Sequence, residues 1–190
     1  MNRIGRLPIS FTTRSSPFGP IALFWEDHQG KSKIRQILLS RPGLPAPQVV
    51  HKTFPGMKSS TCIEIEELAD QIGAFLEGED ICFSLEGTRM DLCSMFQQKV
   101  LRAEHGIPRG SISTYQRIAR YLNRPSSARA VGMALARNPF PIIIPCHRAI
   151  RADGQLGGYQ GGLAIKRKLL EMEGITLDDS GYVTPRKYFY

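Results

Sequence analysis

Runs of apolar and β-branched residues separated by turn residues occupy the first 40 positions, and this pattern predicts three strands, at residues 9–14, 20–26 and 33–39. The polar stretch 27–31 suits a hairpin loop. Residues 40–60 contain four prolines and are expected to form an irregular surface loop. Apolar residues at helical spacing predict a helix over 64–76, and residues 81–85 resemble a further strand. The first half thus reads as a small α+β layer that serves as a scaffold.

The second half reads as helices. The apolar period predicts helices over 91–104, 113–122 and 163–172, with a break at 106–110. Another begins after Ser126 or Ser127, either of which could cap it, and ends near residue 137, before Asn138-Pro139. With the tight turn at 123–125 this makes a helix-turn-helix, although many helical hairpins bind nothing.

Charge divides the 190-residue chain, whose net charge is +8, at the same place. Residues 1–88 carry 9 basic and 10 acidic side chains, and residues 89–190 carry 16 basic and 7 acidic ones. We therefore place a boundary between residues 88 and 89. An arginine-rich half indicates a polyanion partner such as nucleic acid, and a merely solvated basic surface is the alternative. The arginines that could contact phosphate or only solvent are Arg102, Arg109, Arg117, Arg120, Arg124, Arg137 and Arg151.

The helix that ends near residue 137 has an unusual outer face. Val131, Ala134 and Leu135 can face a core, while Gly132 and Ala136 leave the other side small beside Arg129 and Met133. A small-faced helix with one long arginine suits a narrow minor groove, although small residues more often serve helix packing.

Composition excludes several protein classes. The four cysteines, at 62, 82, 93 and 146, form no CxxC pair, which argues against a disulfide scaffold or a zinc ribbon. His28, His51 and His105 are scattered, so we expect no metal. No apolar run is long enough to span a membrane. The early arginines Arg3, Arg6 and Arg14 would fit an organelle presequence, but the strand pattern favours a folded start and a cytoplasmic protein, or a nuclear one in a eukaryote.

Candidate chemistry centres on Cys146, which follows the apolar run 141–145 and precedes His147 and a glycine-rich loop. An isolated cysteine would be assigned to the core. We expect 141–145 to be a short buried strand or extended segment. Neighbouring side chains in extended backbone point apart, so a direct thiol–imidazole contact is awkward and a water relay is more suitable. This geometry argues against an ordinary cysteine hydrolase. Glu173 or Glu171 could orient the imidazole, and spacing does not decide between them.

The segment Ile144-Pro-Cys-His-Arg148 resembles the active-site signature of the O6-alkylguanine-DNA alkyltransferases. Further motifs follow the order and spacing of that family across residues 88–174: Thr114-Tyr115, Ser127-Ala-Arg-Ala-Val-Gly132, Asn138-Pro139, Gly157-Gly-Tyr159, Gly161-Gly162 and Leu169-Leu-Glu-Met-Glu-Gly174. The resemblance implies an α+β fold with an N-terminal ribonuclease H-like α/β domain over 1–88, formed by a small antiparallel sheet plus a helix. It also implies a helical domain over 89–190, with the helix-turn-helix next to the active-site cysteine.

The resemblance also implies roles. Cys146 takes the alkyl group from guanine O6, His147 deprotonates it through a water, and Glu173 polarises His147. Tyr115 donates a proton toward guanine N3 and rotates a phosphate, Arg129 replaces the flipped base in the stack, and Asn138 braces the turn before the active site. Other implied DNA contacts are Ser127, Ala128, Gly132, Arg124, Arg137 and Arg148. The implied alkylguanine site comprises Cys146, Ala149, Tyr159, Gln160, Pro141 and Gly157.

The expected partner is double-stranded DNA containing O6-alkylguanine. We expect a monomer that is used once and needs no cofactor, and the sequence leaves cooperative binding to DNA open. Ala149-Ile150 replaces the commoner Val-Val of the family, and Gln160 stands where several members have Ser or Ala. The alternatives are a non-catalytic binder of alkylated DNA, which would lack the cysteine, and a helix-turn-helix regulator, which would have no use for the Cys-His-Arg segment.

Overall fold

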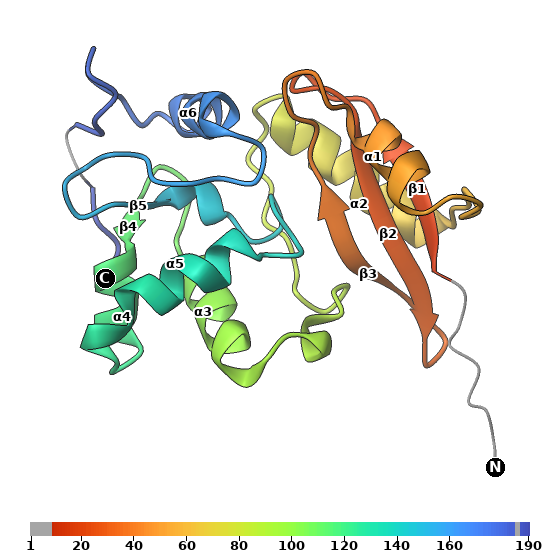
Figure 1. Ribbon diagram of the computed structural model, residues 1–190, viewed down its shortest axis with the longest axis horizontal. Coiled ribbons are helices and arrows are strands. Elements are labelled where there is room, and N and C mark those ends of the chain that lie inside the picture. Colours follow the sequence, from red (N-terminus) through yellow and green to blue (C-terminus); the bar gives the residue numbers. More distant parts are fainter. Residues whose placement is uncertain (1–8, 185–186) are drawn as a thin grey trace.

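The computed structural model describes residues 9–184 and 187–190 and consists of two lobes (Figure 1). Arg3 and Arg6, which raised the question of a presequence, lie outside the described residues. The N-terminal lobe contains strands β1 (Ser10–Arg14), β2 (Ile21–His28) and β3 (Lys31–Leu38) with helices α1 (Ala46–Thr53) and α2 (Ile63–Leu76). The three strands and the long helix that the sequence predicts are therefore present.

The three strands form an antiparallel sheet in the order β1-β2-β3. Its central strand is buried on both faces because side chains alternate. Ile21 and Leu23 pack in the core that includes α2, whereas Ala22 and Phe24 pack with residues of α1. The sheet therefore lies between the two helices, which explains why residues 21–25 of β2 are continuously apolar.

Two expectations for this lobe are wrong. Residues 40–60 were expected to be irregular, yet they contain α1, whose N-cap is Pro45 and whose first turn includes Pro47. Proline is tolerated there because first-turn amides have no intrahelical partner. The segment 81–85 is not a strand. Its Phe83 instead packs edge-on against Phe75 of α2, with ring centroids 5.8 Å apart.

The C-terminal lobe is mainly helical. Its helices are the short 3₁₀ helix η1 (Met90–Leu92), α3 (Met95–His105), α4 (Tyr115–Tyr121), the 3₁₀ helix η2 (Pro125–Ser127), α5 (Ala128–Ala136), the 3₁₀ helix η3 (Cys146–Arg148) and α6 (Leu163–Met172). The predicted helix over 91–104 is divided because the Ser94 side chain accepts from the Gln97 amide and caps α3. Helices α4 and α5 form the helix-turn-helix. Ser127 is the N-cap of α5 but makes no side-chain cap.

A two-stranded parallel sheet joins the helix-turn-helix to the cysteine segment. Strand β4 (Ser113–Thr114), which leads into α4, pairs with β5 (Ala149–Ile150), which follows η3. The segment 141–145 is a tight turn in which Ile142 has φ 77°, so the expectation of a strand or extended chain is wrong. The Ile144 amide donates to the Phe140 carbonyl at 2.8 Å.

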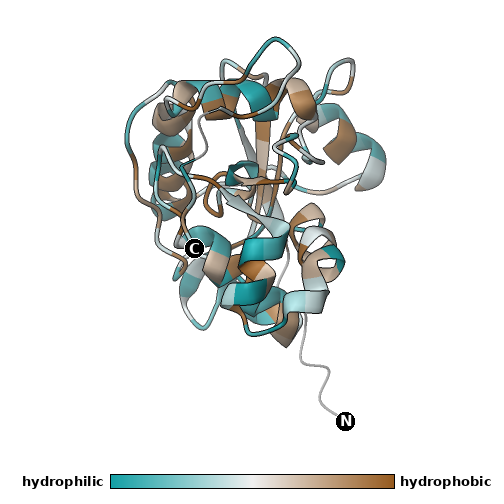
Figure 2. Cartoon of the chain, turned by 90° about the vertical axis from the view of Figure 1, so that its left-hand side faces the viewer, coloured by the Kyte–Doolittle hydropathy of each residue, from teal (hydrophilic) through white to brown (hydrophobic). Residues whose placement is uncertain are grey.

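The main apolar core runs through both lobes, with residues of β2, β3 and α2 packed together with residues of α3, α4, α5 and α6. Figure 2 shows that the helices carry both hydrophobic and hydrophilic residues, as amphipathic helices do. The last residues of the chain dock on this lobe. The Phe189 amide donates to the Ile112 carbonyl, and the Tyr190 ring stacks on Tyr121 with centroids 3.9 Å apart. None of the described helices has the length and apolar character to cross a membrane.

Candidate active site

Cys146 is buried and opens onto a cavity of about 240 Å³. The residues that line the cavity are Tyr115, Gly132, Leu135, Ala136, Cys146, Gly158, Tyr159 and Gln160. Two polar atoms at this place, Tyr159 Oη and Gln160 Oε1, are buried without a hydrogen-bond partner among the described residues. Two residues of the cavity lining therefore carry polar atoms that the described part of the protein leaves without a partner.

Asn138 fixes the turn that precedes the cysteine. Its Oδ1 accepts from the Phe140 amide at 2.9 Å, and its Nδ2 donates to the Ile144 carbonyl at 3.0 Å and to Cys146 Sγ at 3.2 Å. The amide thus holds both ends of the turn and contacts the thiol itself. Pro141 and Ala149, which were expected at the ligand, are buried on either side of this segment and do not line the cavity.

Tyr115 enters the cavity because two glycines make room for it. A Cβ at Gly157, where φ is +68°, would lie 2.7 Å from Tyr115 Oη, and a Cβ at Gly132 would contact its ring at 3.9 Å. Glycine is thus required at position 157 both by its backbone conformation and by the phenol. The loop and α5 together hold the tyrosine across from the cysteine.

Both candidate reacting groups are protonated at neutral pH. Desolvation raises the pKa of the Cys146 thiol to about 11, despite the opposing hydrogen bond from Asn138. Desolvation likewise raises the pKa of Tyr115 to about 12, and the nearby Glu104 carboxyl adds to this effect. The cysteine therefore needs a base before it can act as a nucleophile, whereas the phenol is a proton donor.

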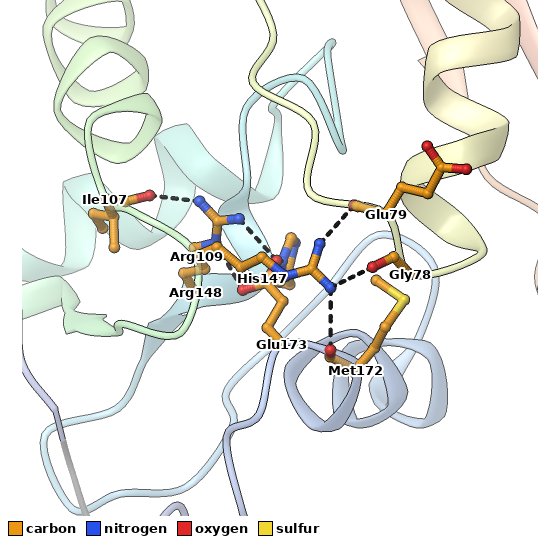
Figure 3. Close-up of polar contacts among 8 residues, drawn as sticks. All are labelled: Gly78, Glu79, Ile107, Arg109, His147, Arg148, Met172 and Glu173. Carbon is orange, nitrogen blue, oxygen red and sulfur yellow. Dashed lines mark hydrogen bonds and ion pairs between the residues drawn. The ribbon is translucent and has the colours of Figure 1, made fainter.

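His147 and Glu173 form a buried pair next to the cysteine (Figure 3). His147 Nε2 lies 2.8 Å from Glu173 Oε1, and within the described chain its Nδ1 has no hydrogen-bond partner. Desolvation lowers the pKa of His147, although Glu173 opposes this shift. Desolvation opposes ionisation of Glu173 too, but the contacts with His147 and Arg148 outweigh it and lower its pKa to about 2. At neutral pH the pair is thus a neutral imidazole beside a carboxylate.

The structure decides between the two glutamates that the sequence left open. Glu171 is exposed and pairs with Arg167 at 2.8 Å, whereas Glu173 contacts His147. It also shows that Cys146 and His147 lie in a 3₁₀ turn, so the argument from extended backbone does not apply to them.

Arg148 was expected to contact DNA, and the structure corrects this expectation. It is buried, and its guanidinium donates to both oxygens of Glu173 at 2.8 Å and to the Ile107 carbonyl at 2.5 Å. Two parallel bonds hold the carboxylate in one orientation. The side chain is therefore committed inside the protein.

Lys166 is a site residue that sequence reasoning missed. It is fully buried, and its Nζ donates to the carbonyls of Ala149 at 2.6 Å, Leu156 at 2.5 Å and Gly158 at 3.4 Å. It thus ties the glycine-rich loop to the strand after the cysteine, and burial lowers its pKa to about 8. Its spacing in the sequence could have indicated this burial. Lys166 lies three residues before Leu169 and four before Leu170, and therefore on the apolar face of α6.

Glu104 was also missed. Its side chain is fully buried in α3, close to the Ala149 backbone. Desolvation raises its pKa to about 8, against the opposing charges of Lys166 and Arg148. As the only acid in an arginine-rich stretch, it could have been singled out from the sequence.

The exposed side of the helix-turn-helix carries the arginines expected at DNA. Arg129 and Arg137 line a groove of about 560 Å³ with Ser127 and Met133, and Arg124 is exposed in the preceding turn. Ala128 is half-buried at the start of α5. The groove and the cysteine cavity are both lined by α5, by residues on different sides of it.

Other candidate arginines are engaged with the protein. Arg151 pairs with Asp153 at 2.7 Å, Arg117 lies over the Tyr188 ring at 4.1 Å, and Arg109 binds three backbone carbonyls. Across residues 9–184 and 187–190, no group of three or more His, Cys, Asp or Glu side chains is arranged to hold a metal.

Comparisons with known proteins show which proteins this chain is similar to. A family model described as the DNA-binding domain of 6-O-methylguanine DNA methyltransferase matches residues 95–175. The crystal structure of Mycobacterium tuberculosis OGT in complex with DNA superimposes with a TM-score of 0.68 at 33% identity, over 87% of this chain and 93% of that one. The methylated-DNA–protein-cysteine methyltransferase of Methanothermobacter thermautotrophicus is 46% identical over 120 residues, 63% of this chain and 67% of that protein.

A longer match extends through both lobes. The Mycobacterium tuberculosis methylated-DNA–protein-cysteine methyltransferase is 38% identical over 170 residues, which are 87% of this chain and 92% of that protein. By this similarity the chain belongs to the methylated-DNA–protein-cysteine methyltransferase family.

Proposed function

We propose that this protein repairs O6-alkylguanine in double-stranded DNA by transferring the alkyl group irreversibly to Cys146. The observation that carries the proposal is the buried thiol, which opens onto a cavity of about 240 Å³ with Tyr115 and Tyr159 on its wall. The thiol is followed directly by the His147–Glu173 pair. A binding module would need neither the thiol nor the pair.

Activation of the thiol begins at Glu173. Its carboxylate accepts the Nε2–H of His147, which leaves the lone pair of the imidazole on Nδ1. Because Nδ1 is buried without a partner among the described residues, it can accept the thiol proton through a bridging water. Asn138 contributes as well, since its hydrogen bond lowers the pKa of the thiol.

The transfer itself is a displacement at the alkyl carbon. The S–C bond forms as the C–O6 bond breaks, and the electron pair passes to the guanine ring. A proton from Tyr115 to guanine N3 neutralises this charge as it develops, which is when a donor lowers the barrier most. The proton that His147 received restores the phenol. The thioether that remains is stable, so one chain repairs one lesion without a cofactor.

A guanine inside a duplex cannot reach this cavity, so the nucleotide must be flipped out of the stack. We assign this step to α5, which presses its small face into the minor groove while Arg129 fills the space that the base leaves. The exposed Arg129 and the adjacent groove support this assignment, as does the solved relative in complex with DNA. We further propose that the chain acts as a monomer on the lesion.

The test is to mix the protein with a duplex carrying one O6-methylguanine and to measure the masses of its peptides. We expect one added methyl group on the peptide that contains Cys146, at one equivalent per protein. The Cys146→Ser variant should gain none and should still bind the duplex. A methyl group that remains on the protein after this substitution, or no gain in the wild type, would contradict the proposal.

A further inference from the structure

The loop between α3 and β4, residues 106–112, meets the ends of two helices from different lobes. Arg109 in this loop donates from Nη1 to the Glu79 carbonyl at 2.6 Å and from Nη2 to the Gly78 carbonyl at 2.8 Å, just beyond the end of α2. The same Nη2 donates to the Met172 carbonyl at 3.2 Å, at the end of α6. One guanidinium therefore joins both helix ends, as Figure 3 shows.

These acceptors are well suited to a cation. Met172 is the last residue of α6, and Gly78 and Glu79 follow directly after the last turn of α2. The end of a helix carries the negative end of its dipole, so a cation close to it is favourable. Of the two helices, neither α2 nor α6 has a basic residue in its last turn. Arg109 supplies that positive charge to both helix ends from outside, and its planar fork satisfies carbonyls that come from two directions.

Both helix ends lead directly to His147. Met172 precedes Glu173, whose carboxylate contacts the imidazole. Phe75 lies in the last turn of α2, with its ring centroid 6.3 Å from that of His147 and 5.8 Å from the Arg109 guanidinium. The imidazole is therefore held between one group from each helix that Arg109 binds.

The rest of the loop supports the same network. The Ile107 carbonyl accepts from Arg148, which holds Glu173. Gly110 has φ +72°, and a Cβ there would lie 3.4 Å from the Glu173 carbonyl oxygen. The loop thus contacts Arg148 through the Ile107 carbonyl and approaches Glu173 closely at Gly110, in addition to the bonds that Arg109 makes.

We propose that Arg109 is a positioning residue: by joining the ends of α2 and α6 it fixes Phe75 and Glu173 against His147, and so holds the imidazole in the orientation that serves Cys146. The inference rests on the proposed alkyl transfer. It gives the N-terminal lobe a part in the reaction, because Phe75, Gly78 and Glu79 belong to that lobe. It also reassigns Arg109 from a possible phosphate contact to an internal clamp.

The experiment compares wild type with Arg109→Met, Arg109→Lys and the control Arg167→Met, which removes an exposed arginine of α6. Free O6-benzylguanine serves as substrate, so that DNA contacts do not contribute, and the fraction of folded protein is measured for each variant. We expect Arg109→Met to react about 100-fold more slowly, since a small displacement of a catalytic group can cost that much. Arg109→Lys should recover part of the rate, and Arg167→Met should match wild type.

A second measurement separates positioning from a loss of stability. NMR of the imidazole nitrogens reports the tautomer of His147, which should be protonated at Nε2 in wild type because Glu173 accepts there. In folded Arg109→Met we expect signals of both tautomers, while affinity for undamaged duplex stays within about twofold of wild type.

Three results bear on the inference in different ways. A wild-type protein that does not become benzylated at Cys146 would overturn the proposed function. Wild-type rate and tautomer in folded Arg109→Met would overturn the clamp alone. Weaker binding to undamaged duplex at an unchanged rate with the free base would show that Arg109 is a phosphate contact, and would overturn it too.

Discussion

At the scale of single residues, Glu173 links stability to chemistry. Its pKa is lowered from 4.5 to about 2, so its contacts stabilise the fold above pH 4.5, and this stabilisation is lost as the pH falls toward 2. A shift of this size corresponds to about 3 kcal/mol. We expect Glu173→Gln to be less stable at pH 7 by about that amount, since it leaves Arg148 buried without its counter-ion. Urea denaturation at pH 7 and at pH 3 measures both effects.

The matched control is Glu171→Gln, because Glu171 is an exposed neighbour whose pair with Arg167 is worth at most about 0.5 kcal/mol. Glu173→Gln should also slow alkyl transfer. Between pH 7 and pH 3 the free energy of unfolding of this variant should fall less than that of wild type. Equal acid sensitivity in wild type and Glu173→Gln would show that this carboxylate is not the group that titrates.

The sequence could identify residues whose chemistry is local. The sequence singled out Cys146 and His147 because a thiol and an imidazole are neighbours, and Asn138 and Tyr115 through the family motif. The structure places Cys146 and Tyr115 at one cavity and Asn138 against the thiol, and their roles stay proposals. Arg148, Lys166 and Glu104 were misassigned or missed because each owes its role to burial. A charged side chain in a one-dimensional pattern reads as exposed, whereas the fold supplies Arg148 with a carboxylate and Lys166 with three carbonyls.

At the scale of elements, periodicity predicted the strands and helices whose apolar faces are continuous. Periodicity failed where the conformation of a segment depends on proline or on contacts with other segments. Proline in the first helical turn removes no intrahelical hydrogen bond, so Pro47 permits the helix at 46–53, and residues 81–85 have strand-like composition but pair with none of the described strands. The turn at 141–145 depends on Asn138, which satisfies its backbone from outside the segment.

Helix α5 carries Arg129, so a substitution of this residue tests the proposed role of the helix in base flipping. We expect Arg129→Ala to alkylate Cys146 from duplex DNA about 100-fold more slowly, because the flipped state loses the group that fills the stack and flipping costs a few kcal/mol. Its rate with free O6-benzylguanine should stay within about twofold of wild type. Single-turnover rates with both substrates measure this. Arg137→Ala on the same groove is the control, and should affect both rates little once DNA is saturating.

Slowing of both reactions by the same factor in Arg129→Ala would point to a disturbed active site and count against base replacement. Restored duplex activity on a substrate whose lesion is mispaired, and therefore easier to flip, would strengthen it.

At the scale of the whole molecule, the structure reduces the number of arginines available to DNA. Nine lie between residues 102 and 151. Arg109, Arg117, Arg148 and Arg151 bind groups of the protein itself. Five others are exposed, and no partner for their side chains occurs among the described residues: Arg102, Arg120, Arg124, Arg129 and Arg137. The net charge of +8 therefore overstates the charge that can face a polyanion.

Salt dependence measures how many of these charges neutralise phosphates. About five contacts predict a slope near −4.5 in a plot of log affinity against log salt. Replacing Arg124 or Arg137 by Ala should reduce the slope by about 0.9 each, because each would release one counterion fewer. Replacing Arg151, whose charge Asp153 already offsets, should change the slope by much less. Fluorescence anisotropy with undamaged duplex between 50 and 200 mM salt measures the slope for wild type and for each variant. An affinity that does not change with salt would mean that phosphate contacts do not dominate binding.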